Sequence, residues 1–258
     1  MSGAVGVYGG TFNPIHLGHL RAAQEVTEAL DLERMLFVPS AQPPHKDARG
    51  DVIAPADRRL EWVRLAVRDN PRFEVDAIEV ERGGASYTVD TLGALRRRLG
   101  GEPPVFTLGH DAFVEMGSWK SPREILALAH IAVTTRPPAG AAPLDEWLPA
   151  VLRDEVEIAP DGLSARNPRA GTWLRVVEVT DLDISASNVR RLVRQGRSTR
   201  YLLPEEVRSA VEASGCYAPG DIAGDLTRDL DGDLDGDLDG NRDGNRDGNR
   251  DRGGRTVT

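Results

Sequence analysis

The stretch GGTFNPIHLGHL, Gly9 to Leu20, separates a short apolar run from a segment with helical periodicity, and it decides the fold. The paired glycines at its start permit a sharp turn and a close approach of the backbone to a ligand. His16 and His19 stand three residues apart where the helical segment begins, so both can face one anion at a helix N-terminus. The spacing matches neither GxGxxG nor GK[ST]. The stretch therefore predicts a strand, a turn and a helix around a phosphate group.

Outward from this stretch, short apolar or β-branched runs alternate with longer segments of helical periodicity. Such alternation predicts an α/β fold with a doubly wound, mostly parallel sheet, whose ligands bind beyond the carboxyl ends of the strands. The expected strands are Ala4–Tyr8, Met35–Val38, Phe73–Val80, Val105–Leu108, Ile131–Thr135 and Leu174–Val179. The expected helices are Leu17–Leu30, Arg58–Val67, Val89–Leu99, Ile125–Ala129, Ser187–Gln195 and Glu205–Ala213, and Val156–Thr172 is left unassigned.

Taken alone, the two histidines fit a tight turn in which they merely cap a helix. A zinc site is a weaker interpretation, because no third ligand stands nearby. However, a strand, a glycine pair, an Asn-Pro step and HLGH occur together in one short run. Histidines at a helix N-terminus supply donors for the charge that builds on phosphate oxygens during phosphoryl-type transfer.

The run GGTFNPIHLGH resembles the GG[ST]F[DN]PxHxGH signature of the HxGH nucleotidyltransferase superfamily. The resemblance implies a Rossmann-like nucleotidyltransferase fold and in-line attack on the α-phosphate of a nucleoside triphosphate, with pyrophosphate leaving. It also implies that His16 and His19 stabilise the crowded phosphorus of the transition state. Asn13 replaces an Asp common in the superfamily, a variation that this branch accepts. The ATP-binding residues implied in this run are Gly9, Gly10, Thr11, Phe12, His16 and His19.

A second candidate phosphate site lies in DISASNVRRLVRQG, residues 183–196. Ser185 and Ser187 can cap a helix that begins near Asn188. Arg190 then falls in its first turns, where the helix dipole disfavours a cation unless an anion is bound. A capped surface helix with solvated arginines explains the residues equally well. ISASNVR resembles the superfamily's second signature, ISxSxxR, which implies that both serines bind phosphate oxygens and Arg190 neutralises the β- and γ-phosphates of ATP.

Further segments resemble one family, the bacterial nicotinate-nucleotide adenylyltransferases. They are PSAQPPHK, ASYTVDTL, GHDAFVEMGSWKSPREIL and the closing stretch from Tyr201 to Gly215. The resemblance implies that Asp111 holds the ribose of the adenylyl half, Trp119 stacks on the pyridine ring and Thr88 binds the nicotinate carboxylate. It implies catalytic roles for His16, His19, Lys46 and Arg190, ATP contacts from Gly109, Asp111, Ser185, Ser187 and Arg190, and acceptor contacts from Thr11, His45, Lys46, Thr88 and Trp119.

Without the resemblance, these segments indicate less. Trp119 could be an ordinary packed loop aromatic, or its flat face could stack on a heteroaromatic ring, with Lys120 favouring an acid substrate. Asp111 could merely cap a helix. Arg136 follows an expected strand at the ligand edge, which is a weak indication of substrate contact.

The implied reaction is attack by the 5′-phosphate of nicotinate mononucleotide on the α-phosphate of ATP, giving deamido-NAD and pyrophosphate. Mg²⁺ is expected to arrive with ATP, and no protein metal site is expected, because the domain shows no carboxylate cluster. The alternatives are another HxGH transferase, with nicotinamide mononucleotide or phosphopantetheine as acceptor, a cytidylyltransferase, and a non-catalytic nucleotide-binding regulator. The intact HLGH and ISAS segments argue against the regulator.

Charge and composition divide the chain near Tyr217. Residues 218–258 carry −5 of the net charge of −9 and only eight apolar residues, so a disordered, acidic Asp/Gly-rich repeat tail is expected after a nucleotidyltransferase domain at 1–217. The tail's LDGD repeats match part of a calcium loop. Arg242 stands where such a loop needs Glu, however, so at most weak cation affinity is expected.

The remaining counts exclude several classes of protein. Overall acidity argues against nucleic-acid binding. The start does not resemble a signal peptide, and the longest apolar stretch falls well short of the roughly 20 residues that span a bilayer, so a cytoplasmic protein with no membrane partner is expected. The single cysteine, Cys216, excludes a disulfide framework and is expected to be buried or half-buried. The oligomeric state is left open, with a homo-oligomer as one option.

Overall fold

The order of the strands places the motif at a reversal in the sheet. The computed structural model describes residues 3–43, 52–135 and 143–218, and their strands form one sheet in the order β3-β2-β1-β4-β5-β8-β7-β6. From β3 to β8 all neighbours are parallel, and β7 and β6 continue the sheet antiparallel. The strands are β1 (Val5–Gly10), β2 (Arg34–Pro39), β3 (Phe73–Val75), β4 (Val105–Gly109), β5 (His130–Thr135), β6 (Glu157–Ile158), β7 (Ser164–Arg166) and β8 (Trp173–Glu178).

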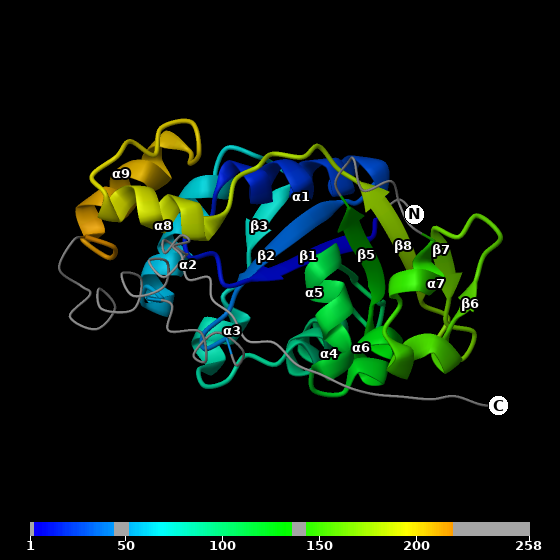
Figure 1. The fold of residues 1–258 in the computed structure, drawn as a ribbon. Helices are drawn as coiled ribbons and strands as arrows, with labels where there is room; N and C mark the ends of the chain where they lie inside the picture. Colours follow the sequence, from blue (N-terminus) through cyan, green and yellow to red (C-terminus); the bar gives the residue numbers. More distant parts are fainter. Residues whose placement is uncertain (1–2, 44–51, 136–142, 219–258) are drawn as a thin grey trace, which may run out of the picture. The chain divides into compact units, whose positions relative to one another are not determined.

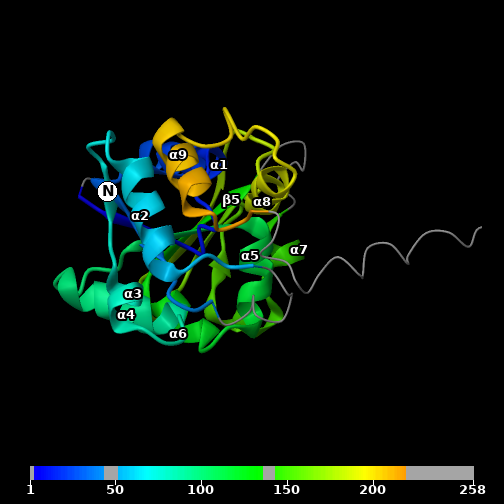
Figure 2. The same ribbon diagram turned by 90° about the vertical axis from the view of Figure 1, so that its left-hand side faces the viewer.

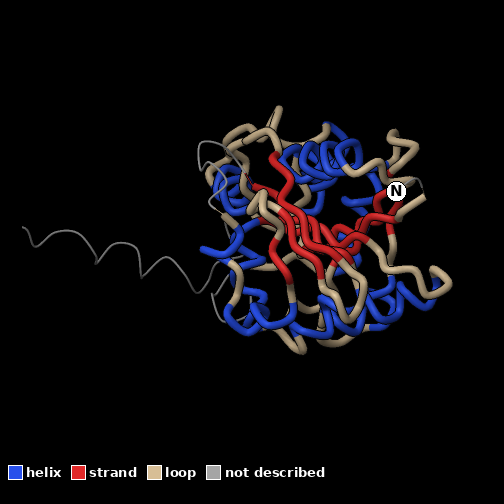
Figure 3. The backbone as a smooth tube through the Cα atoms, turned by 90° about the vertical axis from the view of Figure 1, so that its right-hand side faces the viewer, coloured by secondary structure: helices blue, strands red, loops and turns tan. Residues whose placement is uncertain are grey.

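Helices cover both faces of the sheet, as Figures 1 and 3 show. Alternate side chains of β2 belong to two cores: Phe37 to the core that includes residues of α1, α2, α8 and α9, and Leu36 and Val38 to the core that includes residues of α4, α5 and α6. The doubly wound, mostly parallel architecture predicted from the sequence is therefore confirmed. The helices are α1 (Leu17–Ala29), α2 (Ala56–Val67), α3 (Ile78–Arg82), α4 (Thr88–Arg98), α5 (His110–Glu115), α6 (Pro122–Leu128), α7 (Leu144–Trp147), α8 (Ala186–Arg194) and α9 (Glu205–Ser214), with 3₁₀ turns η2 (Met116–Ser118) and η3 (Ala150–Glu155).

The last helix packs against the N-terminal half of the domain. Figure 2 shows α9 beside α2, and Trp62 of α2 faces Tyr217 just beyond α9, with 6.0 Å between ring centroids. None of the helices within the described ranges is long and apolar enough to cross a bilayer. Only Ala218 of the predicted tail lies inside the described residues, so the division into 1–217 and 218–258 stays a prediction.

One predicted strand was wrong in its second half. The strand expected over Phe73–Val80 stops at Val75, and α3 begins at Ile78. The Asp76 carboxylate accepts the backbone N–H of Ile78 at 3.0 Å, which turns the chain out of the sheet. The side-chain hydrogen bond therefore overrides the alternating apolar pattern that suggested a continuous strand.

The unassigned segment 156–172 contributes the antiparallel edge of the sheet. Its hairpin turns at Asp161 and Gly162, where Gly162 has φ +65° and the Asp161 carboxylate accepts the N–H groups of Leu163 and Ser164 at 2.8 and 3.0 Å. The Pro-Asp-Gly sequence at 160–162 is a standard turn signal, so this hairpin was predictable. The short helices α5 and α7 and both 3₁₀ turns were also not predicted.

Candidate active site

The carboxyl ends of β1 and β4 meet where the strand order reverses, which is the usual ligand site of this architecture. Gly9 and Gly10 end β1, and Gly109 ends β4. A cavity of about 310 Å³ opens beside them. Its lining includes five of the predicted site residues, which are Gly9, Gly10, Thr11, Thr88 and Trp119.

His16 and His19 form a stacked pair at the start of α1. Their ring centroids lie 3.6 Å apart with 24° between the planes, and His16 is buried. The backbone N–H of His16 donates to Nδ1 of His19 at 3.2 Å, so the ring proton of His19 resides on Nε2. A neutral imidazole in this tautomer can donate a hydrogen bond from Nε2 to a phosphate oxygen at the helix N-terminus.

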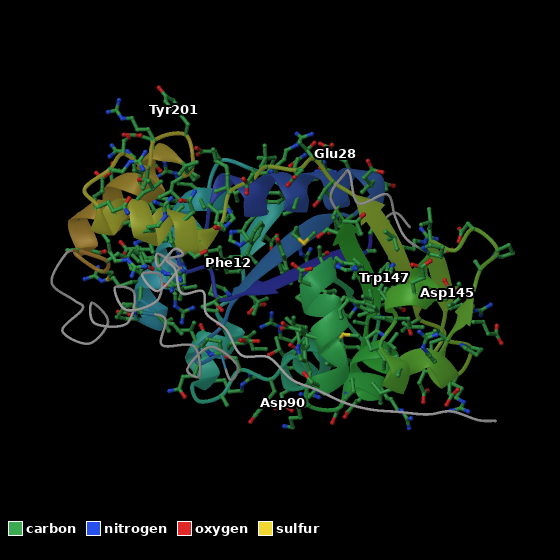
Figure 4. All side chains as sticks on the ribbon, viewed as in Figure 1. Phe12, Glu28, Asp90, Asp145, Trp147 and Tyr201 are labelled. Carbon is green, nitrogen blue, oxygen red and sulfur yellow. The ribbon has the colours of Figure 1, made fainter. Side chains whose placement is uncertain are left out.

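Gly18 and the residue Phe12, whose backbone has a positive φ, keep this pair in place. A Cβ on Gly18 would lie 3.1 Å from Nδ1 of His16, so glycine leaves the room that the imidazole occupies. Phe12, just beyond the end of β1 in Figure 4, has φ +48° and is buried, with its ring edge-on to His19 at 5.2 Å. The Phe12 side chain thus supports His19, and a direct contact of Phe12 with ATP stays a prediction.

The second signature lies against the first, although their contacting residues Asn13 and Arg190 are 177 positions apart in the chain. Ser185 is the N-cap of α8 and accepts the N–H of Asn188 at 3.2 Å, so the helix begins at Ala186 rather than near Asn188. Oγ of Ser187 lies 3.2 Å from Oγ of Ser185, and both serines are exposed. Arg190 is buried, and its Nη1 donates to the carbonyl of Asn13 at 3.0 Å. The structure therefore brings the predicted phosphate-binding residues of both signatures to one edge of the sheet.

Asn13 joins the histidine loop to two other parts of the chain. Its Nδ2 donates to the carbonyl of Val52 at 2.9 Å, and its Oδ1 accepts the N–H of Ala54 at 3.0 Å. The same Oδ1 accepts the hydroxyl of Tyr217, which is 3% exposed and whose pKa burial raises. An amide suits this position because it donates and accepts at once. Cys216, next to Tyr217, is half-buried as predicted.

Arg59 is a site-supporting residue that sequence reasoning missed. It is 1% exposed and donates to the carbonyls of Thr11, Ala54 and Ala41 at 2.7, 2.8 and 3.0 Å, and burial lowers the pKa of its guanidinium. One rigid side chain therefore holds the loop after β1 and both sides of the segment after β2. The signal was present: Arg59 lies on the apolar stripe of its helix, one turn before Val63.

The far wall of the cavity is formed by α4 and the loop before α6. Thr88 is the first residue of α4, and Trp119 is half-buried, with its ring 6.5 Å from that of Phe106. Oγ of Ser86 accepts the N–H of Ala41 at 2.8 Å, which ties this wall to the segment after β2. The structure thus places the predicted acceptor residues Thr11, Thr88 and Trp119 around one cavity.

The remaining predicted site residues fall into two groups. Asp111 lies in the first turn of α5 with a fully exposed carboxylate, 3.3 Å from Nδ1 of His110, and it does not cap the helix. His45, Lys46 and Arg136 lie outside the described residues. Within the part of the chain that the structure describes, no group of three or more His, Cys, Asp or Glu side chains could hold a metal ion.

The fold and the paired signatures define a class, the Rossmann-like nucleotidyltransferases. The model of the cytidylyltransferase-like family matches residues 7–192, which include both signatures. The solved structure of the nicotinic acid mononucleotide adenylyltransferase of Plasmodium falciparum, in complex with NaAD, matches with a TM-score of 0.61 at 12% identity. The match covers 83% of this chain and 97% of that one.

Relatives of higher identity define the family. A probable nicotinate-nucleotide adenylyltransferase of Geotalea daltonii is 44% identical over 84% of this chain and 99% of its own length. Another, from Halorhodospira halophila, is 45% identical over 83% of this chain and 94% of its own length. The chain belongs to the nicotinate-nucleotide adenylyltransferase family, and it is a nucleotidyltransferase enzyme.

Proposed function

We propose that the protein transfers the adenylyl group of ATP to nicotinate mononucleotide, giving deamido-NAD and pyrophosphate in NAD biosynthesis. One observation carries the proposal: two phosphate-binding signatures converge at the end of β1, beside a cavity that carries Thr88 and Trp119. The names of the relatives support this choice of acceptor. We further propose that the reaction takes place in the cytoplasm.

The reaction needs alignment and charge stabilisation more than covalent chemistry from the protein. A 5′-phosphate oxygen of the mononucleotide attacks the α-phosphorus of ATP while the bond to the pyrophosphate oxygen breaks. Nε2–H of His19 and the N-terminal amides of α1 can donate to the α-phosphate oxygens as negative charge builds there. The serines at the start of α8 and Arg190 are assigned to the departing pyrophosphate.

We propose that the metal arrives with the triphosphate, because the described residues offer no carboxylate cage for it. Mg²⁺ bound to ATP would neutralise part of the phosphate charge and retain several waters. Lys46, the remaining cation assigned to the reaction, is proposed to approach the phosphates from the segment after β2.

A pyrophosphate-release assay tests the proposal. ATP is offered with nicotinate mononucleotide, nicotinamide mononucleotide or phosphopantetheine, and CTP replaces ATP in a parallel series. We expect release with ATP and nicotinate mononucleotide to exceed every other combination, with deamido-NAD identified by mass. Faster turnover of phosphopantetheine or of CTP would contradict the assignment and favour another member of the superfamily.

A further inference from the structure

The cavity beside the ends of β1 and β4, which we assign to the acceptor and call the acceptor cavity, is lined by more acidic than basic side chains. Among the described residues that line it, Glu79 and Glu115 are acidic and Lys120 is the one cation. Glu79 is buried and accepts a hydrogen bond from the Thr91 hydroxyl at 2.6 Å. An acceptor that carries a carboxylate on its ring would meet two like charges and one opposite charge in this cavity.

The ammonium of Lys120 is fixed by two neighbours at the start of α4, on the same wall of the cavity. Its Nζ lies 3.0 and 3.2 Å from the two carboxylate oxygens of Asp90 and 4.5 Å from the centroid of the Tyr87 ring. Both neighbours belong to the start of α4, on either side of Thr88. Asp90 itself points outward from α4 in Figure 4. Lys120 lines the cavity next to Trp119, and the two contacts restrict the rotamers of its long side chain.

We propose that Lys120 is a specificity-determining residue that favours the acid acceptor over its amide, with Asp90 and Tyr87 holding its ammonium at the cavity. The inference rests on the proposed function. The amidated mononucleotide has the same ring, ribose and phosphate but lacks the ring carboxylate. The positive charge of Lys120 therefore attracts the ring carboxylate, which only the acid carries, whereas stacking of the ring on Trp119 stabilises both acceptors.

Two variants with opposite effects on charge test the inference. Lys120→Met keeps most of the apolar stem and removes the cation, so we expect the ratio of kcat/KM for the acid to that for the amide to fall by about fivefold at low salt. The loss should shrink as salt is raised, because the side chain is partly exposed. Asp90→Asn keeps one oxygen that can accept from the ammonium but removes the negative charge that offsets Lys120, so it is expected to raise the ratio. The KM for ATP should not change in either variant.

Arg68→Met is a matched control, because Arg68 and Glu206 form an ion pair of similar exposure away from the cavity, and it should leave the ratio unchanged. An unchanged ratio in Lys120→Met would overturn the inference. If the ratio is unchanged because both acceptors lose kcat/KM equally, Lys120 only positions the loop of Trp119. If the unmodified protein turned over neither mononucleotide, the proposed function itself would be wrong. That result differs from an unchanged ratio, so the two failures can be told apart.

Discussion

At the scale of single residues, His19 combines a fixed tautomer with a fixed ring plane. The N–H of His16 occupies its Nδ1, and the rings of His16 and Phe12 pack against it. Such preorganisation lowers the cost of stabilising new charge on phosphate, since no reorientation is needed during reaction.

His19→Ala is therefore expected to lower kcat by at least about a hundredfold, because it removes the donor that we propose acts on the α-phosphate in the transition state. The thermal midpoint should change little, since His19 is only partly buried. Single-turnover pyrophosphate release and a melting curve measure the two effects. His19→Gln retains an amide donor and should lose less activity. Near-normal turnover of the alanine variant would remove His19 from the catalytic set.

Trp119→Ala is expected to raise KM for nicotinate mononucleotide more than KM for ATP, because Trp119 lines the cavity that we assign to the acceptor. Trp119→Phe keeps a smaller aromatic face and should show an intermediate KM. Steady-state kinetics with each substrate varied in turn supply the comparison. Equal increases for both substrates would show that the ring only supports the loop.

At the scale of elements, β5 and β8 are joined at their amino ends by an aromatic stack. His130 lies over Trp173 at 4.6 Å with 9° between the rings, and its Nδ1 accepts the backbone N–H of Trp173 at 3.1 Å. Burial lowers the pKa of His130 to about 4, and the charges of Arg175 and Arg96 add to the effect. The fold therefore favours the neutral imidazole.

Stability should consequently depend on pH between about 6.5 and about 4. In this window the unfolded chain binds a proton at His130 and the folded chain does not, so the urea midpoint should fall as pH falls and level off above about 6.5. His130→Asn offers an oxygen to the same N–H without titrating, so its profile should be flatter than that of the unmodified protein. Parallel profiles would contradict the assignment.

The bounds of the helices and strands show where hydrophobic periodicity predicts secondary structure correctly and where it fails. Helical periodicity located α1 at Leu17–Ala29, one residue short of the predicted end, because its apolar spacing matches the stripe it buries. The same reasoning failed over Phe73–Val80, where a single carboxylate at Asp76 ended the strand. A side-chain hydrogen bond of this kind cannot be recognised from the spacing of apolar residues.

At the scale of the whole molecule, the last described segment is part of the site region. Tyr217 reaches the loop of the first signature and packs near Trp62. Deletion of residues 218–258 should therefore leave adenylyl transfer unchanged, because Tyr217 is kept. A deletion that begins at Cys216 should lower both activity and thermal midpoint, because Asn13 loses its hydroxyl partner. Activity assays and melting curves of the two truncated proteins test both expectations. A large loss of activity on deletion of residues 218–258 would show that the domain extends beyond Tyr217.

The sequence by itself determined the alternation of strands and helices and the residue types of the phosphate site, because glycines, helix-capping histidines and serines act through local geometry. It could not show Arg59 holding three loop carbonyls, Tyr217 bound to Asn13, or Lys120 fixed by Asp90. Those contacts join segments distant in the chain, and only tertiary packing, such as that of α2 against β2, β3 and α9 and of α4 against α6, brings them within hydrogen-bonding distance. The tertiary structure thus decided which side chains support and tune the site.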